Sequence, residues 1–282
     1  MAESNKRFST YNYVENNPIR NIDPDGMMDV GSADYEGGSM DAEAYDASRN
    51  DASEAAFGVS KGRKHGPDGY QAALMAKASY PNWTGGDLDG WRIINLSDHT
   101  GLIPGVKWTD DASSFYSKLF WKVEDDGTNS YVVGFAGSRD WTSWGNDLTQ
   151  LVGASTQYNI AANNAPLISD WAKLEDASLT FVGHSLGGGL AALSSAISGD
   201  NAITFNAAGI SYVTMLRYGL SSSDFNKVRA YVMTSDPVNK AQGNFWPLSN
   251  TAQGTIIPVY PKTLHQYLDG HDIQNFIDLL KK

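Results

Sequence analysis

The sequence predicts an α/β fold with a mostly parallel central sheet and helices on both faces. Short apolar segments of strand character alternate with helix-forming segments, as in the strand expected at 202–206 and the helix expected at 212–218. Residues 183–187 read Gly-His-Ser-Leu-Gly, a turn that requires a strand before it and a helix after it. A chain of 282 residues that is 41% hydrophobic can bury the core of one such domain.

The composition disfavours several classes of function. A formal net charge of −11 argues against nucleic acid as a partner, because phosphate groups repel an acidic surface. The absence of cysteine excludes disulfide bonds and thiolate catalysis. No apolar run has the length of a membrane span, and the first residues lack the apolar region of a signal peptide. We therefore expect this protein to be secreted through a specialised secretion system.

The first 30 residues carry a motif that does not look like the start of an enzyme domain. Residues 7–27 read RFSTYNYVENNPIRNIDPDGM, which resembles the end of the core in Rhs/YD-repeat proteins. In that family the motif joins a β-cage to a variable C-terminal toxin and is cut after D-P-x-G. The resemblance implies roles for Asp23 and Asp25 in cleavage near Met27. An ordinary Asp-Pro and Asp-Gly turn explains the local shape but not the preceding fixed positions.

The resemblance and the composition together predict three regions. Residues 1–30 are expected to be a remnant of the Rhs junction, disordered without its cage. Residues 31–65 form an acidic linker rich in Gly, Ala and Ser, which has too little apolar surface to offset its ordering entropy. Residues 66–282 form the α/β domain.

The elements of this domain follow from hydrophobic patterns and turn signals. A hairpin is expected where the sequence DDGTN separates two strand-like runs at 115–124 and 130–135. The remaining strands are expected at 91–96, 179–182, 202–206, 228–234 and 256–260, and the helices at 70–79, 160–175, 190–197, 212–218 and 272–282.

Ser185, within the turn at 183–187, is the candidate nucleophile. Glycines let the backbone turn sharply, so that the serine hydroxyl stands above the end of the preceding strand. The helix that follows directs its first N–H groups and its positive dipole end toward an oxyanion formed there. A glycine-rich helix start with a buried serine is the alternative, but it does not explain the strand, turn and helix in this order.

A serine nucleophile requires a histidine base, which follows it along the chain in this arrangement. His65 and His99 precede Ser185, and His184 lies inside the turn, where its ring cannot easily reach its own neighbour. Of the two later histidines, His271 follows a glycine and opens the last helix, whereas His265 lies in a packed or surface segment. We predict His271 as the base.

A carboxylate must orient that histidine, and it should come from another strand end. Asp236 follows the strand at 228–234 and precedes Pro237, which prevents the strand from continuing. Other acids after Ser185 lie in turns (Asp200, Asp224) or too near the base (Asp269, Asp272). We predict Asp236 as the third member of the triad.

Ser138, at the end of the strand at 130–135, is a candidate oxyanion-hole residue. A strand that ends in Gly-Ser before the nucleophile is where such enzymes place their second backbone donor. The same segment equally fits a hairpin exit at which Ser138 caps a following helix.

With these positions in order, the domain resembles the class 3 lipases, the fungal triacylglycerol lipase type of α/β-hydrolase. The matching blocks are VVGFAGS, WTSWGNDL, LTFVGHSLGGGLAAL, RAYVMTSDPV and GHDIQNFI. The resemblance implies an oxyanion hole formed by the backbone N–H groups of Ser138 and Leu186, with Asp147 supporting the first loop. It implies neither a metal nor a cofactor. Ala136 departs from the family, which often has arginine there.

An apolar stripe follows the predicted oxyanion loop and has two readings. It consists of Trp141, Trp144, Leu148, Leu151 and Val152. It fits a lid that opens at a lipid surface, and it fits a part of the core equally well.

The leading hypothesis is a lipase or phospholipase carried as an Rhs toxin tip, which attacks membrane lipids and is neutralised by a cognate immunity protein. A general carboxylesterase or acyltransferase on the same scaffold is the enzymatic alternative, because a fold does not determine its substrate. A non-catalytic Rhs-tip interaction module is the alternative of another class. Such a module would need none of the four predicted site residues, which come from separate parts of the sequence.

Overall fold

A computed structural model describes residues 21–22, 30–31, 65–96, 101–138, 150–237 and 251–281. The chain divides into two compact units, Met1–Val59 and Ser60–Lys282. In the first unit, strand β1 (Asn21–Ile22) pairs antiparallel with β2 (Val30–Gly31). The junction residues Asp23 and Asp25 lie outside the described residues, so the predicted cleavage motif and linker stay predictions.

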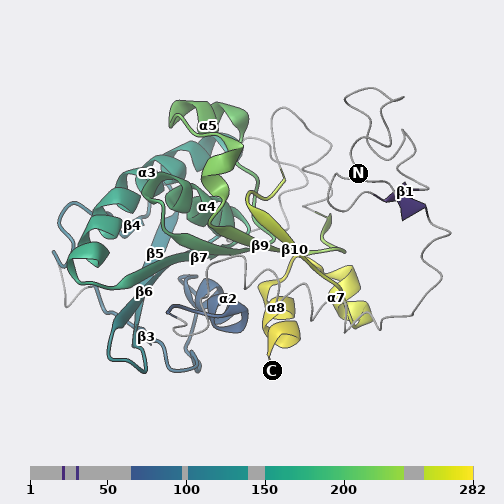
Figure 1. Cartoon of the computed structure of the whole chain (residues 1–282), viewed down its shortest axis with the longest axis horizontal. Helices are drawn as coiled ribbons and strands as arrows, with labels where there is room; N and C mark the ends of the chain where they lie inside the picture. The colour runs from purple at the N-terminus through teal and green to yellow at the C-terminus, as the bar shows by residue number, and fades with distance from the viewer. Residues whose placement is uncertain are drawn as a thin grey trace. The chain divides into compact units, whose positions relative to one another are not determined.

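The second unit is built on a mixed sheet of eight described strands, seven of which the sequence predicts (Figure 1). Five neighbouring strands run parallel, and β5 turns antiparallel to β6 through the predicted hairpin. The spatial order is β10 (Thr255–Val259), β9 (Val228–Met233), β8 (Asn201–Phe205), β7 (Ser178–His184), β6 (Asn129–Phe135), β5 (Phe115–Val123) and β3 (Arg92–Ile93), with β4 (Thr109–Asp110) also on β5.

Helices cover both faces of this sheet (Figure 1). The face drawn downward carries α2 (Gly69–Ala78) and α8 (Ile273–Leu280), which pack against each other. The opposite face carries α3 (Gln150–Leu174) and α4 (Leu186–Ser198), with α5 (Tyr212–Arg217) beyond them. These layers are those of an α/β-hydrolase, so the predicted fold class is confirmed.

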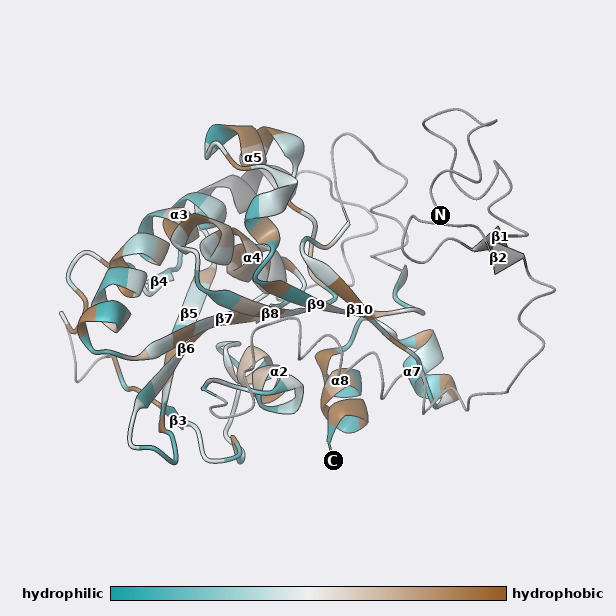
Figure 2. Ribbon diagram, in the orientation of Figure 1, coloured by the Kyte–Doolittle hydropathy of each residue, from teal (hydrophilic) through white to brown (hydrophobic). Residues whose placement is uncertain are grey.

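Alternation along the strands supplies a core on each face. Val133 and Phe181 point toward α3 and α4, whereas Val132 and Val182, one residue away, point toward α2 and α8. Apolar residues therefore dominate the central strands and the inner side of α8 (Figure 2). Burial on both faces explains why consecutive positions of these strands are apolar, as at residues 132–133 and 181–182.

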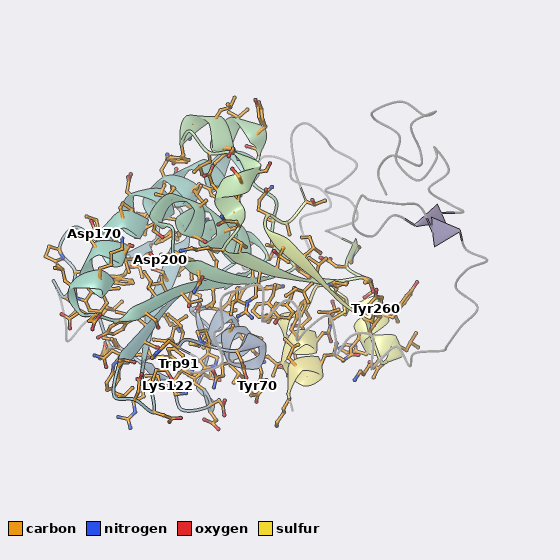
Figure 3. All side chains as sticks on the ribbon, viewed as in Figure 1. Tyr70, Trp91, Lys122, Asp170, Asp200 and Tyr260 are labelled. Atoms are coloured by element: carbon orange, nitrogen blue, oxygen red, sulfur yellow. The ribbon has the colours of Figure 1, made fainter. Side chains whose placement is uncertain are left out.

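Cation–π contacts hold the segment before β3 against β5. Lys122 Nζ lies 6.0 Å from the centre of the Trp91 ring (Figure 3). Lys118 Nζ lies 5.4 Å from the Trp83 ring and donates to the carbonyl groups of Ala78 and Tyr80, at 2.6 and 3.2 Å. Lys118 thereby also satisfies carbonyl groups at the end of α2.

Several elements differ from the prediction, and strand β4 and the 3₁₀ helix Ser222–Phe225 are additional to it. Helix α3 begins at Gln150, ten residues before its predicted start, because no proline interrupts that stretch and Gly153 lowers helix propensity only modestly. Strand β3 has two residues where six were predicted. Helix α7 (Leu264–Leu268) was not predicted, although Thr263 and Gln266 form a capping box that signals it.

The packing of α8 on the sheet generates a stability prediction. The buried Phe276 ring lies 5.2 Å from the Phe205 ring, so Phe276→Ala should lower the free energy of unfolding by about 3–5 kcal/mol. Leu279→Ala, on the partly exposed side of the same helix, should cost about 1 kcal/mol. Urea unfolding of the two variants measures this difference, and equal losses would contradict the packing described here.

Candidate active site

The turn after β7 holds Ser185 in a conformation that few non-glycine residues adopt. Its φ of 55° and ψ of −124° place the side chain above the end of the strand. Glycine is required on both sides of Ser185. A Cβ on Gly183 would collide with the carbonyl of Gly187, and a Cβ on Gly187 would collide with the carbonyl of Phe135. The predicted strand, turn and helix are therefore present.

Ser185, His271 and Asp236 form one hydrogen-bonded series. His271 Nε2 lies 3.0 Å from Ser185 Oγ, and His271 Nδ1 lies 3.1 Å from Asp236 Oδ1. A carboxylate only accepts hydrogen bonds, so the network assigns the proton of a neutral His271 to Nδ1 and leaves the Nε2 lone pair facing the serine hydroxyl. All three residues are buried, with exposed fractions of 4% or less.

Topology explains why these residues meet. The carboxyl ends of parallel strands lie at one edge of a sheet. Ser185 directly follows β7, Asp236 follows β9 by a short turn, and His271 comes from the segment after β10. Asp236 is held in its turn because its N–H donates to the carbonyl of Met233, at 3.0 Å.

Three buried side chains hold the backbone that carries His271. Three successive carbonyl groups each accept a side-chain hydrogen bond from a different part of the fold. Asn275 Nδ2 donates to Asp269 O at 2.6 Å, Asn206 Nδ2 to Gly270 O at 2.7 Å, and His184 Nε2 to His271 O at 2.6 Å. No local pattern in the sequence connects these side chains to the loop.

The two predicted oxyanion-hole residues lie beside Ser185. Ser138 follows β6, the neighbour of β7, and a Cβ on the preceding Gly137 would stand 3.4 Å from Ser185 Cβ. Leu186 is the first residue of α4, where backbone N–H groups have no partner within the helix. Two backbone segments therefore flank Ser185, as an oxyanion hole requires.

His184 is a buried polar residue of this site that does not contact Ser185 through its ring. Its Nδ1 lies 3.0 Å from the hydroxyl of Tyr80, and its ring centre lies 4.9 Å from that of His271. Burial lowers the pKa of His184 to about 3, with a further contribution from His271, so this imidazole is neutral at physiological pH. Burial of the Tyr80 hydroxyl raises the pKa of that group.

The structure describes only some of the other residues considered for the site. Asp147, Trp141, Trp144 and Leu148 are outside the described residues, and Leu151 and Val152 lie in the first turn of α3. The rejected candidate His265 is exposed on α7, and Asp269 and Asp272 bracket the loop that carries His271. The choice between a lid and a core segment therefore stays open.

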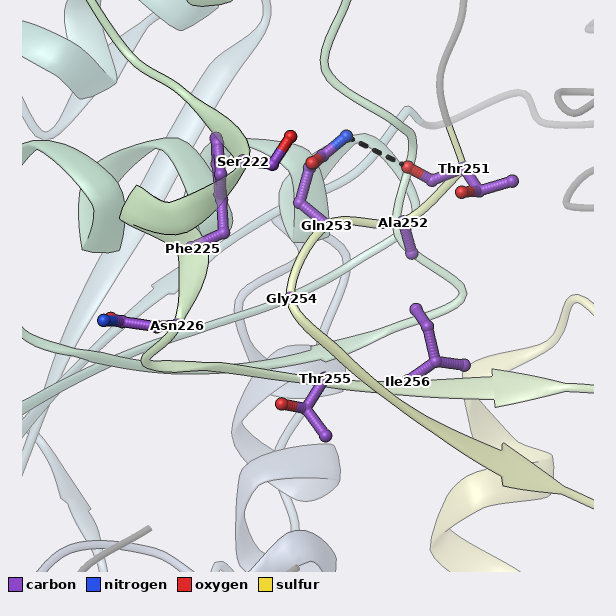
Figure 4. A pocket seen from close by; sticks show the side chains of 9 residues that line it. All are labelled: Ser222, Phe225, Asn226, Thr251, Ala252, Gln253, Gly254, Thr255 and Ile256. Carbon is purple, nitrogen blue, oxygen red and sulfur yellow. Dashed lines mark hydrogen bonds between the residues drawn. The ribbon is translucent and has the colours of Figure 1, made fainter. Parts of the chain in front are cut away.

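A cavity of about 440 Å³ lies at the opposite end of the strands from Asp236 (Figure 4). It opens between the 3₁₀ helix Ser222–Phe225 and the start of β10, where Gln253 Nε2 donates to Thr251 O at 3.3 Å. Its lining residues include no titratable side chain. They are Ser222, Phe225, Asn226, Thr251, Ala252, Gln253, Gly254, Thr255 and Ile256. We assign this cavity no catalytic role.

Two absences apply to the described part of the chain. There, no three His, Asp or Glu side chains gather in a way that would hold a metal ion. None of the helices described above is both long enough and apolar enough to cross a membrane.

The neutral, buried His184 predicts a pH dependence of stability. Its pKa is lower in the folded chain than the ordinary value of about 6.5, so the unfolded chain binds the extra proton and stability falls as the pH drops below 6.5. His184→Gln should therefore reduce the loss of unfolding free energy between pH 8 and pH 5 by about 2 kcal/mol. Chemical denaturation at both pH values measures it. His265→Gln, which removes an exposed histidine of α7, serves as the matched control.

Comparison with known proteins identifies the family of the domain. Residues 71–262 match the family described as phospholipase-like, Tle-like phospholipase domain. The extracellular phospholipase A1 of Serratia liquefaciens is 35% identical over 175 residues, which cover 61% of this chain and 52% of that enzyme. The chain thus spans about half the length of this relative. Because the family match covers 192 of the 282 residues, the chain belongs to the family of Tle-like phospholipase domains.

Proposed function

We propose that this domain hydrolyses an acyl ester of membrane phospholipids, with Ser185 as nucleophile, His271 as general base and acid, and Asp236 as the orienting carboxylate. The hydrogen-bonded series of these three side chains carries the proposal. It lies within a domain that belongs to a phospholipase family, so an ester is the natural electrophile. The same three side chains would serve a carboxylesterase or an acyltransferase. The substrate distinguishes these alternatives from a phospholipase.

In the first step, Ser185 Oγ attacks the ester carbonyl carbon while its proton passes to His271 Nε2. The tetrahedral intermediate then collapses, the bond to the alcohol oxygen breaks, and His271 returns the proton to the leaving lysophospholipid. Asp236 accepts the Nδ1 hydrogen bond throughout, which holds the tautomer and stabilises the imidazolium. An acyl group stays bound to Ser185 Oγ.

In the second step, water replaces the alcohol. His271 Nε2 takes a proton from the water as it attacks the acyl carbon, and Ser185 Oγ departs with that proton. The products are a free fatty acid and the regenerated enzyme. In both steps the negative oxygen lies where the N–H groups of Ser138 and Leu186 meet, at the positive end of the α4 dipole. Charge stabilisation of this kind accounts for about 3–4 kcal/mol per donor in serine hydrolases.

We further propose phospholipase A1 specificity, supported by the name of the 35% identical relative. A toxin role as an Rhs tip, neutralised by an immunity protein and exported by a specialised secretion system, is a separate proposal. It is supported by the junction motif at residues 7–27, which lies outside the family match that begins at residue 71. The class 3 lipase resemblance supports Asp147 as a residue that holds the oxyanion loop.

The first experiment measures fatty-acid release from phosphatidylcholine vesicles labelled separately at the two acyl positions. The wild-type chain should release the position-1 acyl group, and Ser185→Ala should lower the rate by about 10⁴-fold or more. Ser194→Ala is the matched control, because this buried serine on α4 donates only to the carbonyl of Leu190 and should keep full activity.

Other outcomes divide the alternatives. Hydrolysis of a short soluble ester without release from vesicles would indicate an esterase. Release of the position-2 acyl group would contradict A1 specificity alone. Equal activity of wild type and Ser185→Ala would overturn the assignment of the nucleophile.

The toxin proposal has its own test. Directed to the periplasm of a bacterial host, the wild-type chain should arrest growth with accumulation of lysophospholipid, and Ser185→Ala should not. Vesicle hydrolysis in vitro combined with normal growth of the host would contradict the toxin role and leave the enzyme assignment standing.

A further inference from the structure

We propose that Tyr80 and His184 are positioning residues, which link the loop of Ser138 to the backbone of His271 and keep the base aligned with the oxyanion hole. The inference rests on the proposed function, because it assigns a role to residues around that same site. Neither residue touches Ser185 Oγ or Asp236 in the contacts described above. We call their hydrogen-bonded connection the Tyr80–His184 bridge.

The carbonyl group of His271, at one end of the bridge, determines the direction of both hydrogen bonds in the bridge. The carbonyl of His271 can only accept, so His184 Nε2 carries a proton and donates to it at 2.6 Å. A neutral imidazole then has a lone pair on Nδ1, which must accept from the Tyr80 hydroxyl at 3.0 Å. The hydroxyl oxygen in turn lies against Gly137, since a Cβ on that residue would stand 2.5 Å from it. The bridge thus runs from the contact with Gly137 to the carbonyl of His271.

One end of the bridge lies at the proposed oxyanion hole, and the other end lies at the proposed base. Gly137 directly precedes Ser138, whose N–H is a proposed oxyanion donor. His271 carries the proposed base, and the backbone of His184 continues directly into Ser185. The bridge therefore joins the oxyanion loop, the nucleophile turn and the base loop, which come from the ends of β6 and β7 and the segment after β10.

The bridge is firmly anchored at Tyr80. Lys118 Nζ, from β5, donates to the Tyr80 carbonyl, so both the backbone and the hydroxyl of this residue are held. Tyr80 follows α2, whose buried side packs on the sheet together with α8. The loop from Asp269 to His271 is therefore tied to the residue that follows α2.

A pair of variants removes the bridge at different points. Tyr80→Phe removes the hydroxyl that contacts Gly137 and donates to His184 Nδ1, and His184→Leu removes the donor to His271 O. For a soluble short-chain ester, each should lower kcat by about 10- to 100-fold with KM within twofold, because a shift of about 1 Å at a reacting group has this effect. The double variant should be no slower than the worse single variant, because both break one connection.

Conservative and control variants separate positioning from simple stability. His184→Gln keeps an N–H donor at the depth of Nε2 and should recover most of the kcat lost in His184→Leu. Tyr158→Phe removes another buried phenol hydroxyl, beside Gly189, and should leave kcat unchanged. Rates are measured at a temperature where thermal unfolding shows each variant to be folded. If His184→Leu does not fold, Tyr80→Phe alone decides.

Three results would overturn the inference. One is a kcat within twofold of wild type in folded Tyr80→Phe or His184→Leu. The others are an equal loss in Tyr158→Phe and no recovery in His184→Gln, since either of these indicates a general packing defect. Failure of the proposed function is distinguished by Ser185→Ala. Activity that survives Ser185→Ala refutes the triad, whereas activity that Ser185→Ala abolishes and the bridge variants retain refutes the bridge alone.

Discussion

The backbone at Ser185 is the constraint on which the rest of the domain depends. A non-glycine residue with positive φ persists only where its surroundings over-determine it. Here the surroundings are the close approach of α4 to β7 at Gly183 and of α4 to the end of β6 at Gly187. Strands β6 and β7 and helix α4 must therefore pack with backbone against backbone, and this packing puts the loop of Ser138 beside the serine side chain.

The remaining site residues reach Ser185 because parallel strands deliver their carboxyl ends to one edge. That arrangement brings the segments after β9 and β10 near the turn, but it does not determine their exact positions. Buried polar side chains fix the position of the loop that carries His271. Asn206, Asn275 and His184 each donate to one carbonyl of the loop before α8, so the position of the His271 ring follows from hydrogen bonds to its backbone.

These polar groups hold the loop in position because they are buried and hydrogen-bonded. A buried donor or acceptor that loses its partner costs about 1–3 kcal/mol, so each such bond strongly disfavours alternative loop positions. His184 illustrates the requirement. Burial keeps its imidazole neutral, and a neutral imidazole offers one donor and one acceptor, which are the two functions that the Tyr80 hydroxyl and the His271 carbonyl require.

The sequence by itself determined the fold class, most of its strands and helices, and the choice of Ser185, Asp236 and His271 as the residues that meet. It did so because hydrophobic period, turn chemistry and the order of motifs are local properties. It did not reveal α7 or the early start of α3, although both carry local signals. Nor did it reveal any role for Tyr80, Asn206 and Asn275, whose partners lie as far as 104 positions away, as His184 does from Tyr80. Only the packing of α2, β7 and the segment after β10 brings such residues together, because no local pattern encodes which buried donor meets which carbonyl.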